Sequence, residues 1–178
     1  VRTVISADFD NDGYDEIFFN NIGQPNRMFR VREGGLLEPV LLSAALEANG
    51  LGTGAAVADI DNDGVLDLLV AHGESAPQPL SLFRADIDSP GRYLRIAPLT
   101  DNGAPARGAT VILETNMRVH AKTIDAGSGY LCQMEPVAHY GLRTGGVIKS
   151  VSVRWTDGSE NEVSVITENT THTIRKEG

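Results

Sequence analysis

Short stretches in which apolar and polar residues alternate recur along the whole chain, and Gly, Asp, Asn or Pro bound most of them. Alternation with a period of two is typical of half-buried β-strands. The pattern therefore predicts an all-β protein built from many short strands. In the first half, the predicted strands cover residues 2–8, 16–20, 27–32, 38–42, 53–58, 66–71 and 79–84.

One segment of the first half departs from this alternation. Residues 43–50, SAALEANG, combine helix-forming residues with a Ser at the start and a Gly at the end. Residues of these types commonly cap the two ends of a helix. We therefore expect a short helix in this segment.

The second half is predicted to form a separate β-domain. Asp157-Gly158 is a strong signal for a hairpin turn between two of its strands. Frequent turns between short strands indicate a small β-sandwich or a barrel. The turn Ser89-Pro90-Gly91 separates the halves, so we predict domains at residues 1–88 and 92–178. The predicted strands of the second domain cover residues 93–99, 109–114, 118–124, 149–155, 160–166 and 171–176.

A twelve-residue acidic motif occurs twice in the first half. DFDNDGYDEIFF covers residues 8–19 and DIDNDGVLDLLV covers residues 59–70, at an offset of 51. Downstream, RMFR at 27–30 resembles SLFR at 81–84, at an offset of 54. A repeat of about fifty residues is typical of β-propeller blades and similar arrays. We therefore predict that residues 1–88 form two propeller-type blades, a partial propeller.

The spacing of the acidic residues in each motif suits a hard cation. Ca²⁺ takes several oxygen ligands, and carboxylates at positions 1, 3 and 5 of a tight loop can converge on one point. Gly at position 6 permits the sharp turn, while position 7 can add a backbone carbonyl and position 9 a further acid. The predicted ligands are Asp8, Asp10, Asp12, the Tyr14 carbonyl and Glu16 in the first loop, and Asp59, Asp61, Asp63, the Val65 carbonyl and Asp67 in the second.

Two alternatives to this metal site follow from the same residues. An EF-hand needs Glu at position 12 of its loop, where these motifs carry Phe19 and Val70, so an EF-hand is excluded. The other alternative is a pair of Asp/Asn/Gly turns that bind nothing. Two copies with matched spacing favour two structural Ca²⁺ sites over such turns.

The distribution of charge along the chain bears on the kind of partner that it can bind. The chain of 178 residues carries a net charge of −9. Residues 1–91 hold 5 Lys and Arg against 15 Asp and Glu, whereas residues 92–178 hold 10 against 9. The acidic excess therefore lies in the half that contains the motifs, where bound cations would offset it. An acidic surface argues against a nucleic-acid partner, because nucleic acids bind basic patches.

Three further features of the sequence carry less weight. Cys132 is the only cysteine, so the chain holds no internal disulfide, and we expect this side chain to be buried as a small hydrophobe. No apolar stretch approaches the roughly 20 residues that span a membrane. Asn169-Thr170-Thr171 matches the acceptor pattern for N-glycosylation, which is a weak signal.

A hydrolytic second domain that uses the region 125–142 is one alternative function. Asp125, Ser128 and His139 are its candidate acid, nucleophile and base. However, Ser128 lacks the Gly at both second neighbours that the nucleophile elbow of hydrolases needs. We therefore predict no catalytic residue and no enzyme, and we expect His139 to be a hydrogen-bonded structural residue.

A carbohydrate-binding second domain is the other alternative. Trp155 or Tyr130 would then supply an aromatic face on which a sugar ring could stack. Trp155 follows Val151 and Val153 on one face of an alternating strand, so we expect it in the core instead.

The motifs carry a resemblance to known families. The two acidic motifs resemble the calcium loops of FG-GAP repeats, which are the blade units of integrin α-subunit propellers. ARGATV at 106–111, DAGSGYLCQMEPVAHYGL at 125–142 and VSVRWTDG at 151–158 resemble the ASPIC/UnbV domain. In this order, the two are similar to the carboxy-terminal half of the cartilage acidic protein family, and the resemblance covers nearly the whole chain.

The resemblance implies a propeller-type fold with Ca²⁺ in its loops and an extracellular or secreted location. Glu16 departs from the usual Asp at position 9 of such loops, and Asp15 could compete with it as a ligand. No residue of the ASPIC/UnbV motifs matches a known catalytic role. Together with the residues, this predicts an extracellular adhesion or interaction module with two structural Ca²⁺ ions. Its partner would be a protein or glycan at the cell surface or in the matrix, with no nucleic acid and no membrane span.

Overall fold

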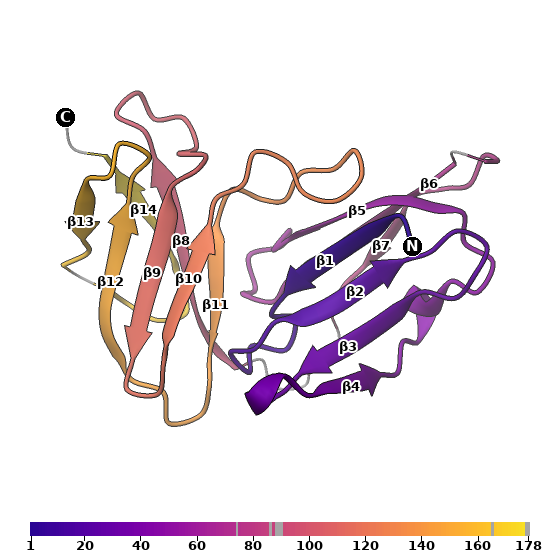
Figure 1. Ribbon diagram of the computed structural model, residues 1–178, viewed down its shortest axis with the longest axis horizontal. Helices are drawn as coiled ribbons and strands as arrows, with labels where there is room; N and C mark the ends of the chain where they lie inside the picture. Colours follow the sequence, from indigo (N-terminus) through magenta and orange to yellow (C-terminus); the bar gives the residue numbers. More distant parts are fainter. Residues whose placement is uncertain (74, 86, 88–90, 165, 177–178) are drawn as a thin grey trace. The chain divides into compact units, whose positions relative to one another are not determined.

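The computed structural model describes residues 1–73, 75–85, 87, 91–164 and 166–176, which form two compact units whose regular secondary structure is almost entirely β-strand (Figure 1). The first unit contains residues 1–10, 14–90 and 127–135, and the second contains residues 11–13, 91–126 and 136–178. The predicted all-β fold is confirmed, and the described residues form open sheets rather than a closed barrel or propeller. No helix in the described part of the chain has the length and apolar character needed to cross a membrane.

The first unit consists of two antiparallel meanders, each like one propeller blade. In each meander, an acidic motif connects the first strand to the second. The first sheet has the order β1-β2-β3-β4, with β1 (Thr3–Ala7), β2 (Glu16–Asn20), β3 (Arg27–Val31) and β4 (Leu37–Val40). The second sheet has the order β5-β6-β7, with β5 (Gly52–Ala58), β6 (Asp67–His72) and β7 (Ser81–Phe83).

The core of the first unit lies between these two sheets. In the first sheet Ile5 pairs across the strands with Phe18, and both side chains are buried. In the second sheet Ala55 pairs with Val70 in the same way. Full burial of a large apolar side chain stabilises a fold by about 1.5–3 kcal/mol. The apolar residues that end each acidic motif, such as Phe18 and Val70, therefore anchor the second strand of each blade in the core.

The helix predicted over residues 43–50 is wrong. The segment holds only a single 3-10 turn, η2 (Ala44–Leu46), in which Ser43 makes no capping hydrogen bond through its side chain. Glu47 has a left-handed backbone with φ of 40°, which ends the helical path after one turn. Its carboxylate accepts a hydrogen bond from Ser81 and faces His72, so contacts with the second blade decide this conformation. A second 3-10 turn, η1 (Glu33–Gly35), precedes β4.

The second unit is a small sandwich of two sheets. One sheet has the order β10-β9-β12-β13 and the other β11-β8-β14, in which β14 runs parallel to β8. The hairpin predicted at Asp157-Gly158 is confirmed, because β12 and β13 pair antiparallel on either side of it, although β13 is shorter than expected. The strands are β8 (Arg92–Leu99), β9 (Thr110–Thr115), β10 (Val119–Thr123), β11 (Ala138–Leu142), β12 (Ile148–Arg154), β13 (Glu160–Glu162) and β14 (Thr171–Arg175).

The core of the sandwich contains the residues that the alternation in the second half predicts. Val151, Val153 and Trp155 are buried, and they pack with Leu94 and Tyr140. Trp155 is therefore a core residue, as expected, and its indole N–H donates a hydrogen bond to Asn161. A buried ring offers no face for stacking on a sugar.

One segment from the second half of the chain packs with the first unit. Within residues 127–135, the Tyr130 N–H donates to Thr3 Oγ1 at 3.1 Å, and the Glu135 N–H donates to the Val57 carbonyl at 3.4 Å. The predicted boundary turn at residues 89 and 90 lies outside the described residues. Separate folding of residues 1–88 and 92–178 stays a prediction.

Candidate metal centre

The two acidic motifs form loops with the same backbone conformation. At position 4 Asn11 and Asn62 have φ of 57° and 61°, and at position 6 Gly13 and Gly64 have φ of 86° and 84°. Only Gly, and to a lesser extent Asn and Asp, enters this left-handed region readily. The shared NDG sequence therefore produces the same tight turn twice, once between β1 and β2 and once between β5 and β6.

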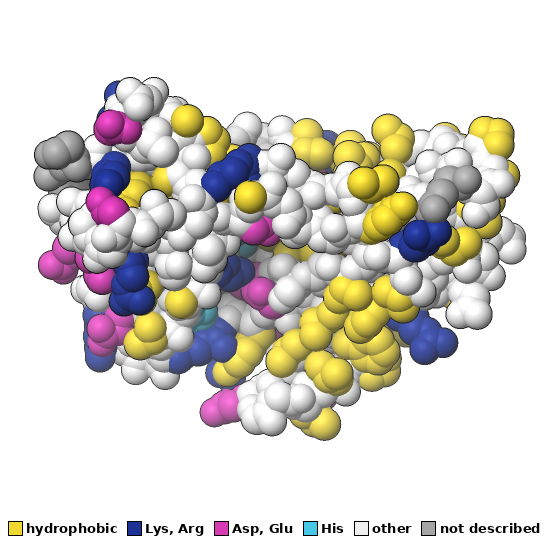
Figure 2. Space-filling view, turned by 45° about the horizontal axis from the view of Figure 1, so that its top comes forward, with side chains coloured by type: hydrophobic (Ala, Val, Ile, Leu, Met, Phe, Trp, Pro, Cys, Tyr) yellow, Lys and Arg dark blue, Asp and Glu magenta, His cyan; other side chains and the backbone are white. Residues whose placement is uncertain are grey.

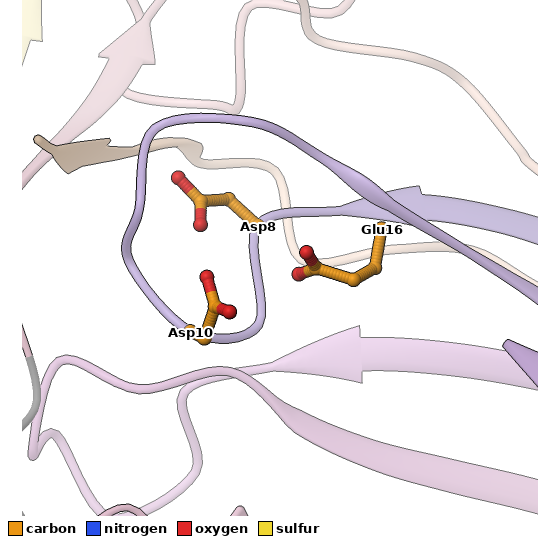
Figure 3. Close-up of side chains that lie close together, drawn as sticks. All are labelled: Asp8, Asp10 and Glu16. Carbon is orange, nitrogen blue, oxygen red and sulfur yellow. The ribbon is translucent and has the colours of Figure 1, made fainter. Parts of the chain in front are cut away.

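In the first loop, three carboxylates converge. Asp8, Asp10 and Glu16 each place an oxygen within 4.8 Å of the others. Figure 3 shows Asp8 and Asp10 projecting into the loop while Glu16 reaches toward them from the start of β2. Asp8 is 1% exposed and Glu16 is 2% exposed, although carboxylates are almost never buried without a compensating charge. The predicted ligand residues Asp12 and Tyr14 are half-buried, and the Asp12 carboxylate is not a member of this cluster.

In the second loop, a different trio converges. Asp59, Asp61 and Asp63, at positions 1, 3 and 5, place their oxygens within 4.8 Å of one another. Asp59 is buried, whereas Asp61 and Asp63 are exposed. The predicted ligands Val65 and Asp67 are buried, and Asp67 lies outside the trio. An acid of this loop also accepts a hydrogen bond from the turn itself, since the Gly64 N–H donates to Asp59 Oδ2 at 3.1 Å.

The acid at position 9 has a structural role that the sequence did not reveal. Glu16 Oε2 accepts a hydrogen bond from the Phe9 N–H at 3.0 Å, and Asp67 Oδ2 accepts one from the Ile60 N–H at 3.1 Å. Phe9 and Ile60 both occupy position 2, so the same contact closes both loops. Burial, together with repulsion from Asp63 and Asp59, raises the pKa of Asp67 above its ordinary value.

Two arginines contact the acidic loops at matching places. Arg30, on β3, forms an ion pair with Asp10, and its Nε lies 3.3 Å from Glu16 Oε1. Arg84, directly after β7, forms an ion pair with Asp61. Partial burial lowers the pKa of Arg30, but attraction to Asp10 and Glu16 outweighs this effect and raises it overall.

The chemistry of these loops fits a hard divalent cation. Each cluster offers only carboxylate oxygens, which are the ligands that Ca²⁺ takes. In each loop, a guanidinium already stands in as the cation beside the acid at position 3. A matched signal was present in the sequence, since RMFR and SLFR carry these arginines at corresponding places, but sequence spacing could not pair them with the loops.

The three residues considered for the hydrolytic alternative are divided between the two units. Ser128 belongs to the first unit, where its hydroxyl is buried and makes no hydrogen bond with described residues. In the second unit, Asp125 is exposed and His139 is buried. The His139 ring stacks on Tyr93, and its Nε2 lies 2.7 Å from Asn11 Oδ1, so this residue is hydrogen-bonded as expected.

Two more side chains were singled out from the sequence. Tyr130 is half-buried, with the Arg2 guanidinium 5.0 Å from the centre of its ring. Cys132 is also half-buried rather than fully buried, and burial raises the pKa of its thiol. A Cβ added to Gly54 would lie only 2.3 Å from the Cys132 Sγ. The thiol therefore packs closely on β5.

Comparison with known proteins assigns both halves of the chain. An FG-GAP-like repeat matches residues 8–70, and the ASPIC and UnbV family matches residues 99–178. Cartilage acidic protein 1 of Mus musculus is 51% identical over 177 residues, which cover 94% of this chain and 27% of that protein.

The human protein of the same name is 53% identical over 167 residues, which cover 89% of this chain and 25% of that protein. The chain thus spans about a quarter of the length of the curated relatives it matches. The chain combines an FG-GAP-like repeat with an ASPIC and UnbV domain, and it is homologous to cartilage acidic protein over most of its own length.

Proposed function

We propose that this chain is a calcium-binding extracellular interaction module in which Ca²⁺ is a structural ion of the two blade loops. The observation that carries the proposal is the convergence of three carboxylates in each of two loops with the same backbone turn. Bound Ca²⁺ would neutralise these acids and hold the turn between the first two strands of each blade.

The ligand sets proposed for the two loops differ. Asp8, Asp10 and Glu16 would form the first set, and Asp59, Asp61 and Asp63 the second. Ca²⁺ takes about 6–8 oxygens, so further ligands are needed at each site. We propose Asp12 and the Tyr14 carbonyl for the first loop, and the Val65 carbonyl and Asp67 for the second, with water completing both shells.

The interaction role rests on homology and on the surface. The relatives carry the name cartilage acidic protein, which supports an extracellular matrix setting with a protein or glycan partner. Figure 2 shows apolar side chains exposed over the first unit. Large exposed apolar areas occur more often at interaction sites than elsewhere on a protein surface. The exposed large hydrophobic residues of this unit include Leu36, Leu37, Leu41, Leu69, Leu80 and Leu82.

We propose that the module has no enzymatic role and folds as two domains. A fragment covering residues 92–178 should give a dispersed NMR spectrum of the β-sandwich core without added Ca²⁺. The backbone amides of residues 127–135 should lose their protection from hydrogen exchange in this fragment, because their partners Thr3 and Val57 are missing. A disordered spectrum throughout would contradict independent folding.

Calcium stoichiometry tests the proposed function. Equilibrium dialysis at millimolar Ca²⁺ should show two sites in the chain as it stands, with an affinity on the order of 10⁻⁴–10⁻³ M, as in extracellular modules. Asp10→Ala and Asp61→Ala should each remove about one site. Asp101→Ala removes an acid from an exposed turn outside both loops and should leave two. Unchanged stoichiometry in both loop variants would show that the acidic turns do not bind the ion.

A further inference from the structure

The two blades repeat an arginine contact that the calcium proposal does not use. Arg30 ends RMFR and Arg84 ends SLFR, and each pairs with the acid at position 3 of its own blade's loop. The partners are Asp10 and Asp61, which are also members of the two carboxylate clusters. The same contact thus arises twice, in two loops that share one backbone turn.

A guanidinium and a divalent cation compete for the same oxygens. Each arginine donates charge-assisted hydrogen bonds to carboxylate oxygens, whereas Ca²⁺ needs those oxygens as ligands. A cation placed at the centre of the cluster would also repel a guanidinium only a few ångströms away. Binding of the ion therefore requires the arginine to withdraw from the loop.

The arginines have room to withdraw. Arg30, Arg84, Asp10 and Glu16 all line one cleft of about 480 Å³ in the first unit. The Arg30 side chain is 29% exposed and the Arg84 side chain is 58% exposed, so both reach solvent. A rotamer change into this cleft would release the carboxylates without disturbing the strands.

We propose that Arg30 and Arg84 are internal counter-cations that occupy the acidic loops in the absence of metal and set the affinity of each loop for Ca²⁺. This inference rests on the proposed function, because it concerns the regulation of the same two sites. In the ion-free protein, the arginines offset carboxylate repulsion and hold the loops in shape.

The two loops are expected to differ in affinity. Arg30 contacts two of the three converging acids of its loop, Asp10 and Glu16, and Glu16 is almost fully buried. Among the three converging acids of its loop, Arg84 pairs with Asp61 alone, and the side chains of this pair are 58% and 37% exposed. Exposed ion pairs contribute little, so Ca²⁺ displaces Arg84 more readily. The second loop should therefore bind Ca²⁺ more tightly than the first.

Charge-removing variants test this competition in the full chain. In an NMR titration with CaCl₂, the amide signals of Gly13 and Gly64 report the two loops separately. Arg30→Gln should tighten binding at the first loop about two- to fivefold, and Arg84→Gln should tighten the second by about twofold or less, by the size of such ion pairs. Arg32→Gln is the control, because Arg32 pairs with Glu38 at 2.8 Å outside the loops.

The stability of the ion-free protein gives a second readout. In chelator, Arg30→Gln should melt below the parent chain because its loop has lost its counter-cation, and the rise in melting temperature on adding Ca²⁺ should be larger. If Arg30→Gln fails to fold, the exposed Arg84→Gln still tests the inference at the second loop.

The outcomes separate this inference from the proposed function. If the parent chain binds Ca²⁺ and both variants bind it equally or more weakly, the arginines do not compete and the inference is overturned while the function stands. If the parent binds none at 10 mM and the variants do, the arginines are permanent substitutes for the metal, which supports the inference and contradicts the function. If no form binds, both are overturned.

Discussion

Removal of Ca²⁺ is predicted to destabilise the first unit and to leave the second unchanged. Both carboxylate clusters lie in the first unit, in the connections β1–β2 and β5–β6. An ion that binds only the folded state stabilises it by RT ln(1 + [Ca²⁺]/Kd), which is about 1.4 kcal/mol per site at ten times Kd. Two sites give about 2.8 kcal/mol, a large share of the ~5–15 kcal/mol that typical domains possess.

For a unit of this size, that free energy corresponds to a fall in melting temperature of about 10–20 °C in chelator. Hydrogen exchange of the full chain, measured with 10 mM CaCl₂ and with EDTA, resolves the two units. Peptides from residues 8–19 and 59–70 should lose protection in EDTA, whereas peptides from β9 and β12 should not. Equal exchange under both conditions in all four segments would refute the reasoning, because the loops would then be ordinary acidic turns.

Two further predictions concern packing and charge elsewhere. Gly54→Ala should destabilise the first unit by about 1–3 kcal/mol in urea unfolding, because the added Cβ would lie 2.3 Å from Cys132 Sγ. The control Gly127→Ala adds a Cβ that makes only ordinary contacts, so it should leave the stability unchanged. Equal effects of the two substitutions would contradict this prediction. In the second unit, hydrogen bonds from Lys176, and secondly from Ser159, lower the pKa of the Asp157 carboxyl. The contribution of the ionised carboxylate to the stability of the fold is therefore complete above the ordinary Asp pKa, and it is lost as the pH falls through the lowered value. Lys176→Met should return the carboxyl titration, followed by NMR, toward the ordinary value; an unchanged titration would exclude the contact.

Local patterns predicted most of the strands and the places of both loops. Alternation along β1, β2, β9 and β12 depends only on neighbouring residues, so it is visible in one sequence. The NDG turns are equally local, because Asn and Gly alone select the left-handed backbone. The predicted convergence at positions 1, 3 and 5 describes the trio of the second loop, whereas in the first loop Glu16 takes the place of Asp12.

Long-range contacts explain what the sequence could not predict. The helix over residues 43–50 fails because Glu47 turns to contact His72 and Ser81, which lie on the second blade. The arginine partners of the acidic loops, one on β3 and one directly after β7, come from about twenty residues downstream. The packing of residues 127–135 against β5 joins positions more than seventy residues apart. A single sequence records each of these residues but not its partner.

The most direct test of the central claim is anomalous scattering from crystals grown in millimolar CaCl₂. The account predicts two peaks in the first unit, one among Asp8, Asp10 and Glu16 and one among Asp59, Asp61 and Asp63. Ligand oxygens should lie at about 2.3–2.6 Å from each ion. If neither loop holds a peak and the Arg30 and Arg84 ion pairs persist at saturating Ca²⁺, the loops are not calcium sites.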